Sequence, residues 1–279
     1  MLFSQLTWLL VSQKSRAYFR ALRWSGRRHC PRCSFSRRMY KLNSGQFKCS
    51  RCKYKFTDFS GTYIGNLRIS LDILSHLLYL FAFGVPAYRI RFYVKASLTT
   101  VEKVFRLFRQ AVYDHSLMEL RKLSGKLELD EAMFGGYRKG KRGWGAAGKR
   151  LVFGICQRNG KVITFPVSDR RAETLEPLIE THTKQGSIHY TDDYEGYMSL
   201  STRGEHVRIL KEKGRPLREN INGMEGFWSY AKNWLYHFRG VPKKYFHLYL
   251  KETEFRFNNR EKDLFPLLAR MLVKLVPDS

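Results

Sequence analysis

Three acidic side chains stand where they could support metal-dependent chemistry on phosphates. Asp130 lies in the alternating stretch 126–134, Asp192 follows the strand-like run 187–191, and Glu225 begins a helical stretch. Carboxylates that converge repel one another and raise one another's pKa values unless cations lie between them. Two Mg²⁺ or Mn²⁺ ions roughly 3.5 to 4 Å apart would resolve this repulsion and support in-line displacement at a phosphodiester. These residues are therefore the candidate catalytic and Mg²⁺-binding residues.

Each of these carboxylates also has an ordinary structural explanation. Asp130 would suit a solvated strand position, and Asp192 would suit a turn or a helix cap. Asn222 followed three residues later by Glu225 has the spacing of a helix N-cap with its capping-box partner. Asp193 competes with Asp192 for the second position.

The helix that begins near Met224 places a cation on the same face as its glutamate. Lys232 follows Glu225 by seven residues, nearly two full turns, so both side chains project from one side. Lys232 would therefore lie near the carboxylates, and Asn222 stands at the start of the same helix. The buried stripe of this helix is expected at Phe227, Trp228, Ala231, Trp234 and Leu235.

Two cysteine pairs predict a structural zinc site. Cys30 and Cys33 precede a hairpin-like segment, residues 39–48, and Cys49 and Cys52 follow it. Each Cys-x-x-Cys pair offers two thiolates, and the hairpin brings the pairs together around one tetrahedral Zn²⁺. Disulfides and reduced structural cysteines are the alternatives. A fifth cysteine, in an apolar run at position 156, is expected in the core. Basic residues along the ribbon suggest contact with DNA, although a solvated basic face would have the same composition.

The charge of the chain predicts a polyanionic partner. Its 51 Lys and Arg residues outnumber its 24 Asp and Glu residues and give a formal charge of +27. Nucleic acid is the expected partner, since neither a basic amphipathic helix nor a lipidation signal for membrane binding is evident. The apolar start is interrupted by Ser4, Gln5 and Thr7, which argues against a signal peptide, and the apolar run 73–85 is too short to cross a membrane. We therefore expect an intracellular, soluble protein with reduced thiols.

A helix-turn-helix unit is predicted after the ribbon. A first helix follows Ser70 and stops at Gly84 and Pro86, and a short second helix covers 87–94. A capping box, residues 99–102, then opens a third helix. On that helix Lys103, Arg106 and Arg109 would face DNA phosphates or bases. An ordinary three-helix packing unit is the alternative.

From residue 126 the pattern predicts an α/β domain. The expected order is three strands, a helix, a strand, a short helix, a strand and a helix, which resembles the ribonuclease H fold. In that fold the first and fourth strands are adjacent and parallel, which would place Asp130 beside Asp192 at the sheet centre, with Glu225 closing the cluster. Glu131 would point to the opposite face, because successive strand residues alternate. The expected strands are 126–134, 149–157, 161–167, 187–191 and 206–210, with helices at 172–183, 195–200, from 224 and at 243–259.

A glycine-rich basic loop is predicted between the first two strands of this domain. It is too rich in glycine for a helix and too basic for a core, so we expect it to contact the phosphate backbone and an unpaired base. A disordered basic loop is the alternative. Its candidate DNA-binding residues are Arg138, Lys139, Lys141, Arg142 and Trp144.

Four motifs together resemble a known enzyme family. They are Leu129-Asp130-Glu131-Ala132-Met133-Phe134-Gly135-Gly136, Tyr190-Thr191-Asp192-Asp193-Tyr194-Glu195-Gly196-Tyr197, Asn222-Gly223-Met224-Glu225-Gly226-Phe227-Trp228 and Phe255-Arg256-Phe257-Asn258-Asn259-Arg260. In order and spacing, from about residue 28 to 268, the chain resembles DDE-type transposases of bacterial insertion sequences. The resemblance is to the branch with a zinc ribbon that is related to Merlin transposons. It favours Asp192 over Asp193, because Asp192 follows Thr191 in the family's Thr-Asp pattern. The resemblance also implies that Lys232 contacts DNA near these carboxylates, with Asn222 approaching the same site.

The resemblance implies a domain order and a function. We expect an N-terminal segment (1–27), a zinc ribbon (28–60), a helix-turn-helix domain (66–122) and a ribonuclease H-like catalytic domain (123–279) with a mixed five-stranded sheet. The family binds terminal inverted repeats of double-stranded DNA, hydrolyses phosphodiesters with Mg²⁺ and joins the ends to target DNA. It implies a homodimer on DNA and a cytoplasmic, nucleoid-associated bacterial protein. A DNA-binding regulator with an inactive catalytic domain and a ribonuclease H-like nuclease are the alternatives.

Overall fold

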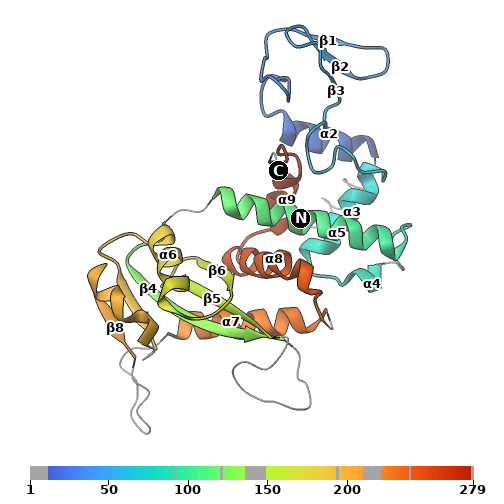
Figure 1. Ribbon diagram of the computed structural model, residues 1–279. Coiled ribbons are helices and arrows are strands. Elements are labelled where there is room, and N and C mark those ends of the chain that lie inside the picture. Colours follow the sequence, from blue (N-terminus) through green and yellow to red (C-terminus); the bar gives the residue numbers. More distant parts are fainter. Residues whose placement is uncertain are drawn as a thin grey trace. The chain divides into compact units, whose positions relative to one another are not determined.

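The chain folds into two compact units. The computed structural model describes residues 12–90, 92–119, 122–135, 149–192, 195–209, 221–238 and 240–277. The first unit comprises residues up to His115 together with those from Glu261 onward, and the second runs from Ser116 to Arg260 (Figure 1).

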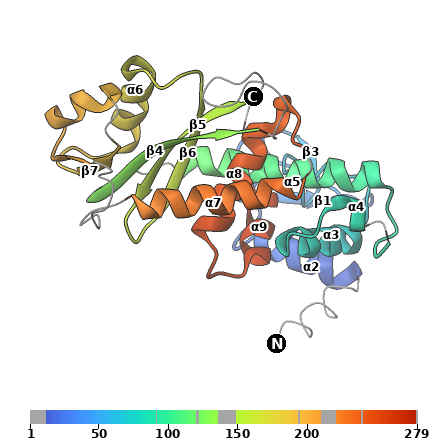
Figure 2. The ribbon, with the colours of Figure 1, turned by 90° about the horizontal axis from the view of Figure 1, so that it is seen from below.

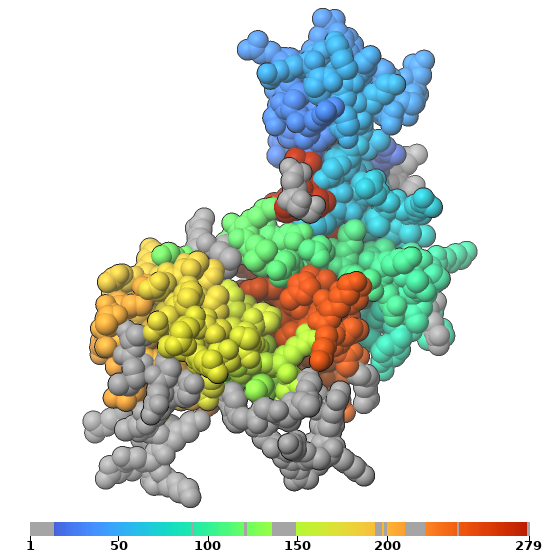
Figure 3. All heavy atoms as spheres, viewed as in Figure 1, coloured from blue at the N-terminus to red at the C-terminus, as the bar shows by residue number. Residues whose placement is uncertain are grey.

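A small three-stranded ribbon in the first unit confirms the predicted hairpin. Strands β1 (Met39–Lys41), β2 (Phe47–Cys49) and β3 (Lys55–Phe56) pair in that order, and both pairs are antiparallel. Gly45 turns the hairpin at a φ of 78°, where a residue with a Cβ would be strained. In the space-filling view, the blue atoms of α2 (Ser12–Arg23) and the ribbon form one lobe of this unit (Figure 3).

Five helices make up the rest of the described part of the first unit. Besides α2 they are α3 (Leu71–Ala82), α4 (Ala87–Ile90), most of α5 (Leu98–Met118) and α9 (Leu264–Leu272). The predicted apolar stripe of α3 is buried, and α3 packs against α2 and α9. Helix α4 is shorter than the predicted 87–94 segment. Helix α9 was not predicted from the sequence.

The start of α5 corrects the predicted capping box. The helix begins at Leu98, and the Ser97 hydroxyl accepts a hydrogen bond from the Thr100 backbone N–H at 3.2 Å. Ser97 therefore caps the helix two residues before the position that we predicted at Thr99. Sequence reasoning favoured the later residue because Glu102 completes a capping-box spacing with it.

A five-stranded mixed sheet forms the centre of the second unit. Its order is β6-β5-β4-β7-β8, with β4 parallel to β7 and antiparallel to β5. The predicted adjacency of the first and fourth strands is therefore confirmed, and the unit has the ribonuclease H-like arrangement. The strands are β4 (Lys126–Phe134), β5 (Arg150–Gln157), β6 (Val162–Val167), β7 (Ile188–Thr191) and β8 (His206–Arg208).

Helices cover both faces of this sheet, and each face has its own apolar core. On one face α7 (Asn222–Tyr236) and α8 (Phe246–Asn258) pack against the core that includes Ala132 and Phe134. On the other face α6 (Ala172–His182) and the 3₁₀ helix η1 (Glu195–Thr202) cover Leu127 and Leu129. Figure 2 shows α6 and α7 on opposite sides of the strands. The short 3₁₀ turn η2 (Lys243–Tyr245) leads into α8. Alternation along β4 thus sends Asp130 towards α7.

Candidate active site and metal site

Asp130 lies near the middle of β4 and faces α7. The indole N–H of Trp228 donates a hydrogen bond to Asp130 Oδ2 at 3.1 Å. The pKa of Asp130 is raised to about 6, mainly by burial. Hydrogen bonds from the Glu131 backbone and Trp228 lower this pKa, and the nearby negative charges of Asp192 and Glu225 raise it. The pKa of Asp130 therefore responds to both of the other candidate carboxylates.

Asp192 stands directly after β7, the strand beside β4. Its Oδ2 lies 3.6 Å from a terminal guanidinium nitrogen of Arg170, and its side chain is 40% exposed. Its other oxygen, Oδ1, is buried, and no described residue gives it a hydrogen bond. A buried carboxylate oxygen that has no donor is a position where a cation would be favoured.

Glu225 is exposed in the first turn of α7, and a residue of β4 fixes that turn. The buried carboxylate of Glu128 accepts hydrogen bonds from the Met224 backbone N–H (2.9 Å) and from Arg158 Nε (2.9 Å). A Cβ at Gly223 would lie 2.7 Å from Glu128 Oε2, so this close approach requires glycine. Glu128 and Asp130 alternate on the same face of β4, and one binds the start of α7 while the other contacts its second turn.

The predicted cap of α7 was wrong. Ile221 occupies the cap position and gives no side-chain hydrogen bond, while Asn222 is the first helical residue. The carboxylate that satisfies the N-terminus of this helix therefore comes from β4 and not from the local sequence. Asn222 is exposed, as a DNA contact requires.

Glu131 points to the opposite face of β4, as predicted, yet it is linked to the candidate site. The Tyr197 hydroxyl donates to Glu131 Oε1 at 2.6 Å, and Arg170 lies 3.6 Å from Glu131 Oε2 and 3.6 Å from Asp192. Burial raises the pKa of Glu131 to about 7, partly offset by Tyr197 and Arg170. Arg170 thus bridges the two carboxylates across the end of the sheet.

The carboxylates share an electrostatic environment without being drawn together as metal ligands. Among the residues that the structure describes, only the four cysteines form a group of three or more His, Cys, Asp or Glu side chains close enough to hold a metal ion. Carboxylate oxygens are the ligands that a hard cation such as Mg²⁺ prefers. A cation bound here would offset the repulsion between Asp130 and Asp192. It would also give Asp192 Oδ1 a partner, since no described residue donates a hydrogen bond to that atom.

The predicted DNA-binding residues differ in their exposure. Lys232, Lys103 and Arg106 are exposed. Arg109 is only 4% exposed, and its guanidinium lies 5.4 Å from the Phe81 ring centroid and 5.9 Å from that of Phe105. Arg109 therefore belongs to the core of the first unit, because the apolar stripe of α5 extends to its side of the helix. The candidate residues Arg138, Lys139, Lys141, Arg142 and Trp144, and the rival Asp193, lie outside the described residues.

The four ribbon cysteines have the geometry that zinc requires. Their sulfur atoms all lie within 4.8 Å of one another, with Cys30 and Cys52 at 3.5 Å and Cys33 and Cys49 at 3.7 Å. Tetrahedral Zn²⁺ at about 2.3 Å from each sulfur would separate the sulfurs by about 3.8 Å. All four cysteines are free thiols, so the disulfide alternative is wrong. Cys156 is buried in the second unit, as predicted.

Sequence reasoning missed the residues that orient the carboxylates. Arg170, Tyr197 and Trp228 each contact a carboxylate that stands far away in the sequence. Tyr197 and Trp228 stand in two of the four sequence motifs, but the local pattern assigned neither of them a role towards a carboxylate. One signal was available for Glu128, because it alternates with Asp130 on a face of the strand that continues with the apolar residues Ala132 and Phe134. A buried charge at such a position requires a partner.

Comparisons with known proteins agree with this arrangement. Residues 122–258 match the ISXO2-like transposase domain, and residues 12–55 match a transposase zinc-ribbon domain. The chain is 40% identical over 116 residues to an uncharacterized transposase-like protein of Haemophilus influenzae, which covers 41% of this chain and 94% of that relative. No helix in the described ranges is both long and apolar enough to cross a membrane. The zinc ribbon, the five-stranded sheet and these matches together establish that the chain belongs to the ISXO2-like transposase family.

Proposed function

We propose that this chain is a DDE transposase that binds the terminal inverted repeats of an insertion sequence as double-stranded DNA. It hydrolyses phosphodiesters at the ends and joins the freed 3′-hydroxyls to target DNA. Hydrolysis and strand transfer are the same in-line displacement with different nucleophiles, so one site serves both reactions. Because two ends must be brought together, the active complex contains at least two copies of the chain.

One observation carries the proposal: the fold brings the three elements that bear these carboxylates together. Strand β4, which bears Asp130, pairs in parallel with β7, which Asp192 directly follows. Trp228 of α7, the helix that bears Glu225, donates a hydrogen bond to Asp130. The negative charges of Asp192 and Glu225 accordingly raise the pKa of Asp130. The family match over residues 122–258 includes all three.

Asp130, Asp192 and Glu225 would hold the metal ions. Two Mg²⁺ ions bound there would neutralise the carboxylates, activate the attacking oxygen and stabilise the leaving oxygen. The protein orients these ligands through Trp228, which donates to Asp130, and through Arg170, which lies beside Asp192. The hydrogen bond from Trp228 lowers the pKa of Asp130 and so favours the ionised form that a metal ligand needs.

Exposed cations near these carboxylates and on α5 would bind the DNA backbone. Lys232 stands on α7, the helix that carries Glu225, and its ammonium can neutralise a phosphate close to the reacting one. Lys103 and Arg106 on α5 are exposed and would contact DNA in the manner of a helix-turn-helix third helix.

Cleavage of DNA by single-residue variants tests the proposal. The wild-type chain should nick a duplex that carries the element's end only when Mg²⁺ or Mn²⁺ is present. Asp130→Asn, Asp192→Asn and Glu225→Gln should each lose nicking by about 10³-fold or more while they retain DNA binding. Glu173→Gln, an exposed carboxylate of α6, is the control and should cleave normally.

Three results would contradict the proposal. Metal-dependent nicking that survives in Asp130→Asn would exclude the assigned carboxylates. Binding without nicking in the wild type would favour a DNA-binding regulator with an inactive catalytic domain. Cleavage of branched or hybrid substrates with no preference for the element's end would favour a ribonuclease H-like nuclease.

A further inference from the structure

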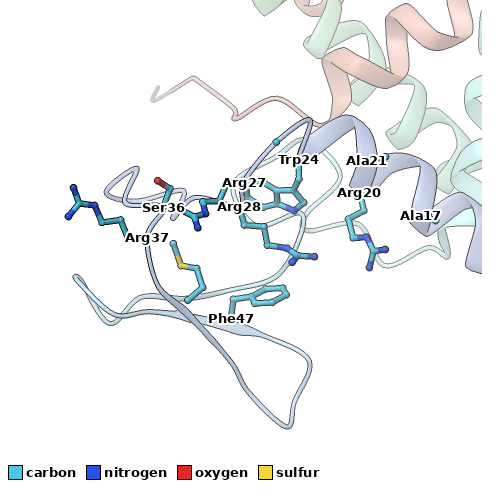
Figure 4. Close-up of a pocket in the computed structure, with 11 residues that line it drawn as sticks. Ala17, Arg20, Ala21, Trp24, Arg27, Arg28, Ser36, Arg37 and Phe47 are labelled. Carbon is cyan, nitrogen blue, oxygen red and sulfur yellow. The ribbon is translucent and has the colours of Figure 1, made fainter.

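We propose that a groove between α2 and the zinc ribbon binds the phosphate backbone of DNA, independently of base sequence. The groove lies wholly in the first unit and has a volume of about 720 Å³. Its walls come from α2, the segment that follows it, and the ribbon (Figure 4). The inference rests on the proposed function only for the identity of the ligand as DNA, and its test does not require cleavage.

The groove presents an uncompensated positive surface. Four arginines line it, and none of its described lining residues is acidic. Arg20, Arg27 and Arg37 are exposed, and no described residue forms an ion pair or hydrogen bond with their guanidinium groups. In Figure 4 Arg27 and Arg28 lie between Arg37 and Arg20. Cations along a groove are suited to a ligand with repeated negative charges, such as a phosphodiester chain.

A buried carboxylate fixes the fourth arginine. Asp58 Oδ1 accepts hydrogen bonds from Arg28 Nε (3.0 Å) and from the Trp24 indole N–H (2.9 Å), and its side chain is 8% exposed. The contact uses the Nε of Arg28, so the terminal nitrogens of the guanidinium can still donate to a second anion. The guanidinium also lies 4.4 Å from the Phe47 ring centroid. Arg28 is therefore oriented before any ligand arrives.

The aromatic residues of the groove already contact cations, which argues against base stacking. Arg28 covers Phe47, and the Arg23 guanidinium lies 4.8 Å from the Trp24 ring centroid. His29 packs edge-on against Trp24 at 5.1 Å. An aromatic ring stacks a base through a free face. The groove is therefore built to recognise charge, and we expect it to contribute equally to any duplex.

A triple variant tests this groove in the full-length protein. Arg20→Gln, Arg27→Gln and Arg37→Gln remove its three unpaired cations together. The control replaces three exposed cations of the same unit that do not line the groove and lie outside the ribbon, with Arg16→Gln, Arg68→Gln and Arg270→Gln. Zinc content and melting temperature should be unchanged in both variants, because none of the six side chains is buried.

The readout is DNA affinity as a function of salt, measured for an end-containing duplex and for a scrambled duplex. Each phosphate contact contributes about 0.9 to the slope of log affinity against log salt concentration. In the groove variant the magnitude of this slope should fall by about 2 to 3 on both duplexes. Near 100 mM salt this variant should bind DNA at least 10-fold more weakly than the wild type. In the control variant the magnitude of the same slope should fall by less than about 1.

Three outcomes would overturn the inference. Equal losses in the two triple variants would mean that the groove has no special role. A loss confined to the end-containing duplex would indicate base recognition. Tighter binding to polyglutamate than to duplex DNA, abolished in the groove variant, would indicate an acidic protein partner. If the wild type fails to nick DNA, the proposed function fails. The inference about the groove still stands in that case, provided that the groove variant shows the smaller slope of log affinity against log salt concentration.

Discussion

Gly154 is the cross-strand partner of Asp130 in the β4–β5 pair, and its missing side chain makes room for the contact that orients that aspartate. A Cβ at Gly154 would lie 2.4 Å from Met224 Cε and 2.8 to 2.9 Å from two ring carbons of Trp228. The same indole donates its N–H to Asp130 at 3.1 Å. The position of α7 on the sheet and the orientation of Asp130 therefore both depend on glycine at position 154.

Replacing Gly154 should uncouple Trp228 from Asp130. Gly154→Ala inserts a methyl group where α7 packs, so the indole must move away from the carboxylate. We expect a loss of about 1–3 kcal/mol in the free energy of unfolding, as for other overpacked cores, together with loss of nicking. Denaturant melts and the nicking assay measure these two effects.

Gly26→Ala is the matched control for this prediction. A Cβ at this exposed position of the first unit would meet no heavy atom within 4 Å. It should change stability by less than about 0.5 kcal/mol. Similar effects of the two substitutions would contradict the special role of Gly154.

Glu128 should be needed for the stability of α7 on the sheet. Its buried carboxylate accepts hydrogen bonds from Arg158 and from the Met224 backbone N–H. Glu128→Gln removes the negative charge that pairs with Arg158, and an amide has only one oxygen to accept from these two donors. We expect destabilisation of about 2–4 kcal/mol by urea unfolding. The exposed Glu173→Gln should stay within about 0.5 kcal/mol of the wild type. An equal effect in both variants would show that the Glu128 contacts contribute nothing.

Removal of one ribbon thiolate should release the zinc. Cys30→Ser leaves three thiolates, and we expect its metal content to fall from about one Zn²⁺ per chain to well below that in an elemental analysis. The first unit should then melt at a lower temperature, because metal binding and ribbon folding are coupled. Cys156→Ala should keep its zinc, since that cysteine lies in the second unit. Full zinc content in Cys30→Ser would contradict the assignment.

His189 should make the protein less stable at acidic pH. It is fully buried in β7, and burial, together with the positive charges of Arg203 and His206, lowers its pKa from 6.5 to about 4. His189 binds a proton more readily in the unfolded chain than in the folded one. The contribution of neutral His189 to the free energy of unfolding is therefore complete above pH 6.5 and is lost as the pH falls towards 4. The full effect is at most ~3 kcal/mol, since one pKa unit corresponds to about 1.4 kcal/mol.

This prediction is tested by measuring, for each variant, how much the free energy of unfolding changes between pH 6.5 and 4. Buried carboxylates such as Glu131 have raised pKa values and the opposite pH dependence. His189→Leu should therefore lose less stability than the wild type between pH 6.5 and 4, whereas His237→Gln, at an exposed position after α7, should follow the wild type. Parallel curves for His189→Leu and the wild type would contradict the prediction.

The amino-acid sequence alone predicted several of the strands and helices in both units. Period-two alternation over Lys126–Phe134 and the apolar stripe of Leu71–Ala82 are local patterns, and the structure gives both elements the predicted bounds. The spacing of the cysteine pairs likewise specified the ribbon, because the hairpin between them is short. The adjacency of β4 and β7 followed from the element order.

Only the tertiary structure decided how the candidate site is held in place. Glu128 meets the start of α7 across 96 residues, and Trp228 meets Asp130 across 98. Such contacts depend on how two elements pack, and no local pattern encodes them. The same reason explains the errors at Asn222 and Arg109: a cap supplied from a distant strand, and a cation buried beneath neighbouring aromatic rings, both override local preference.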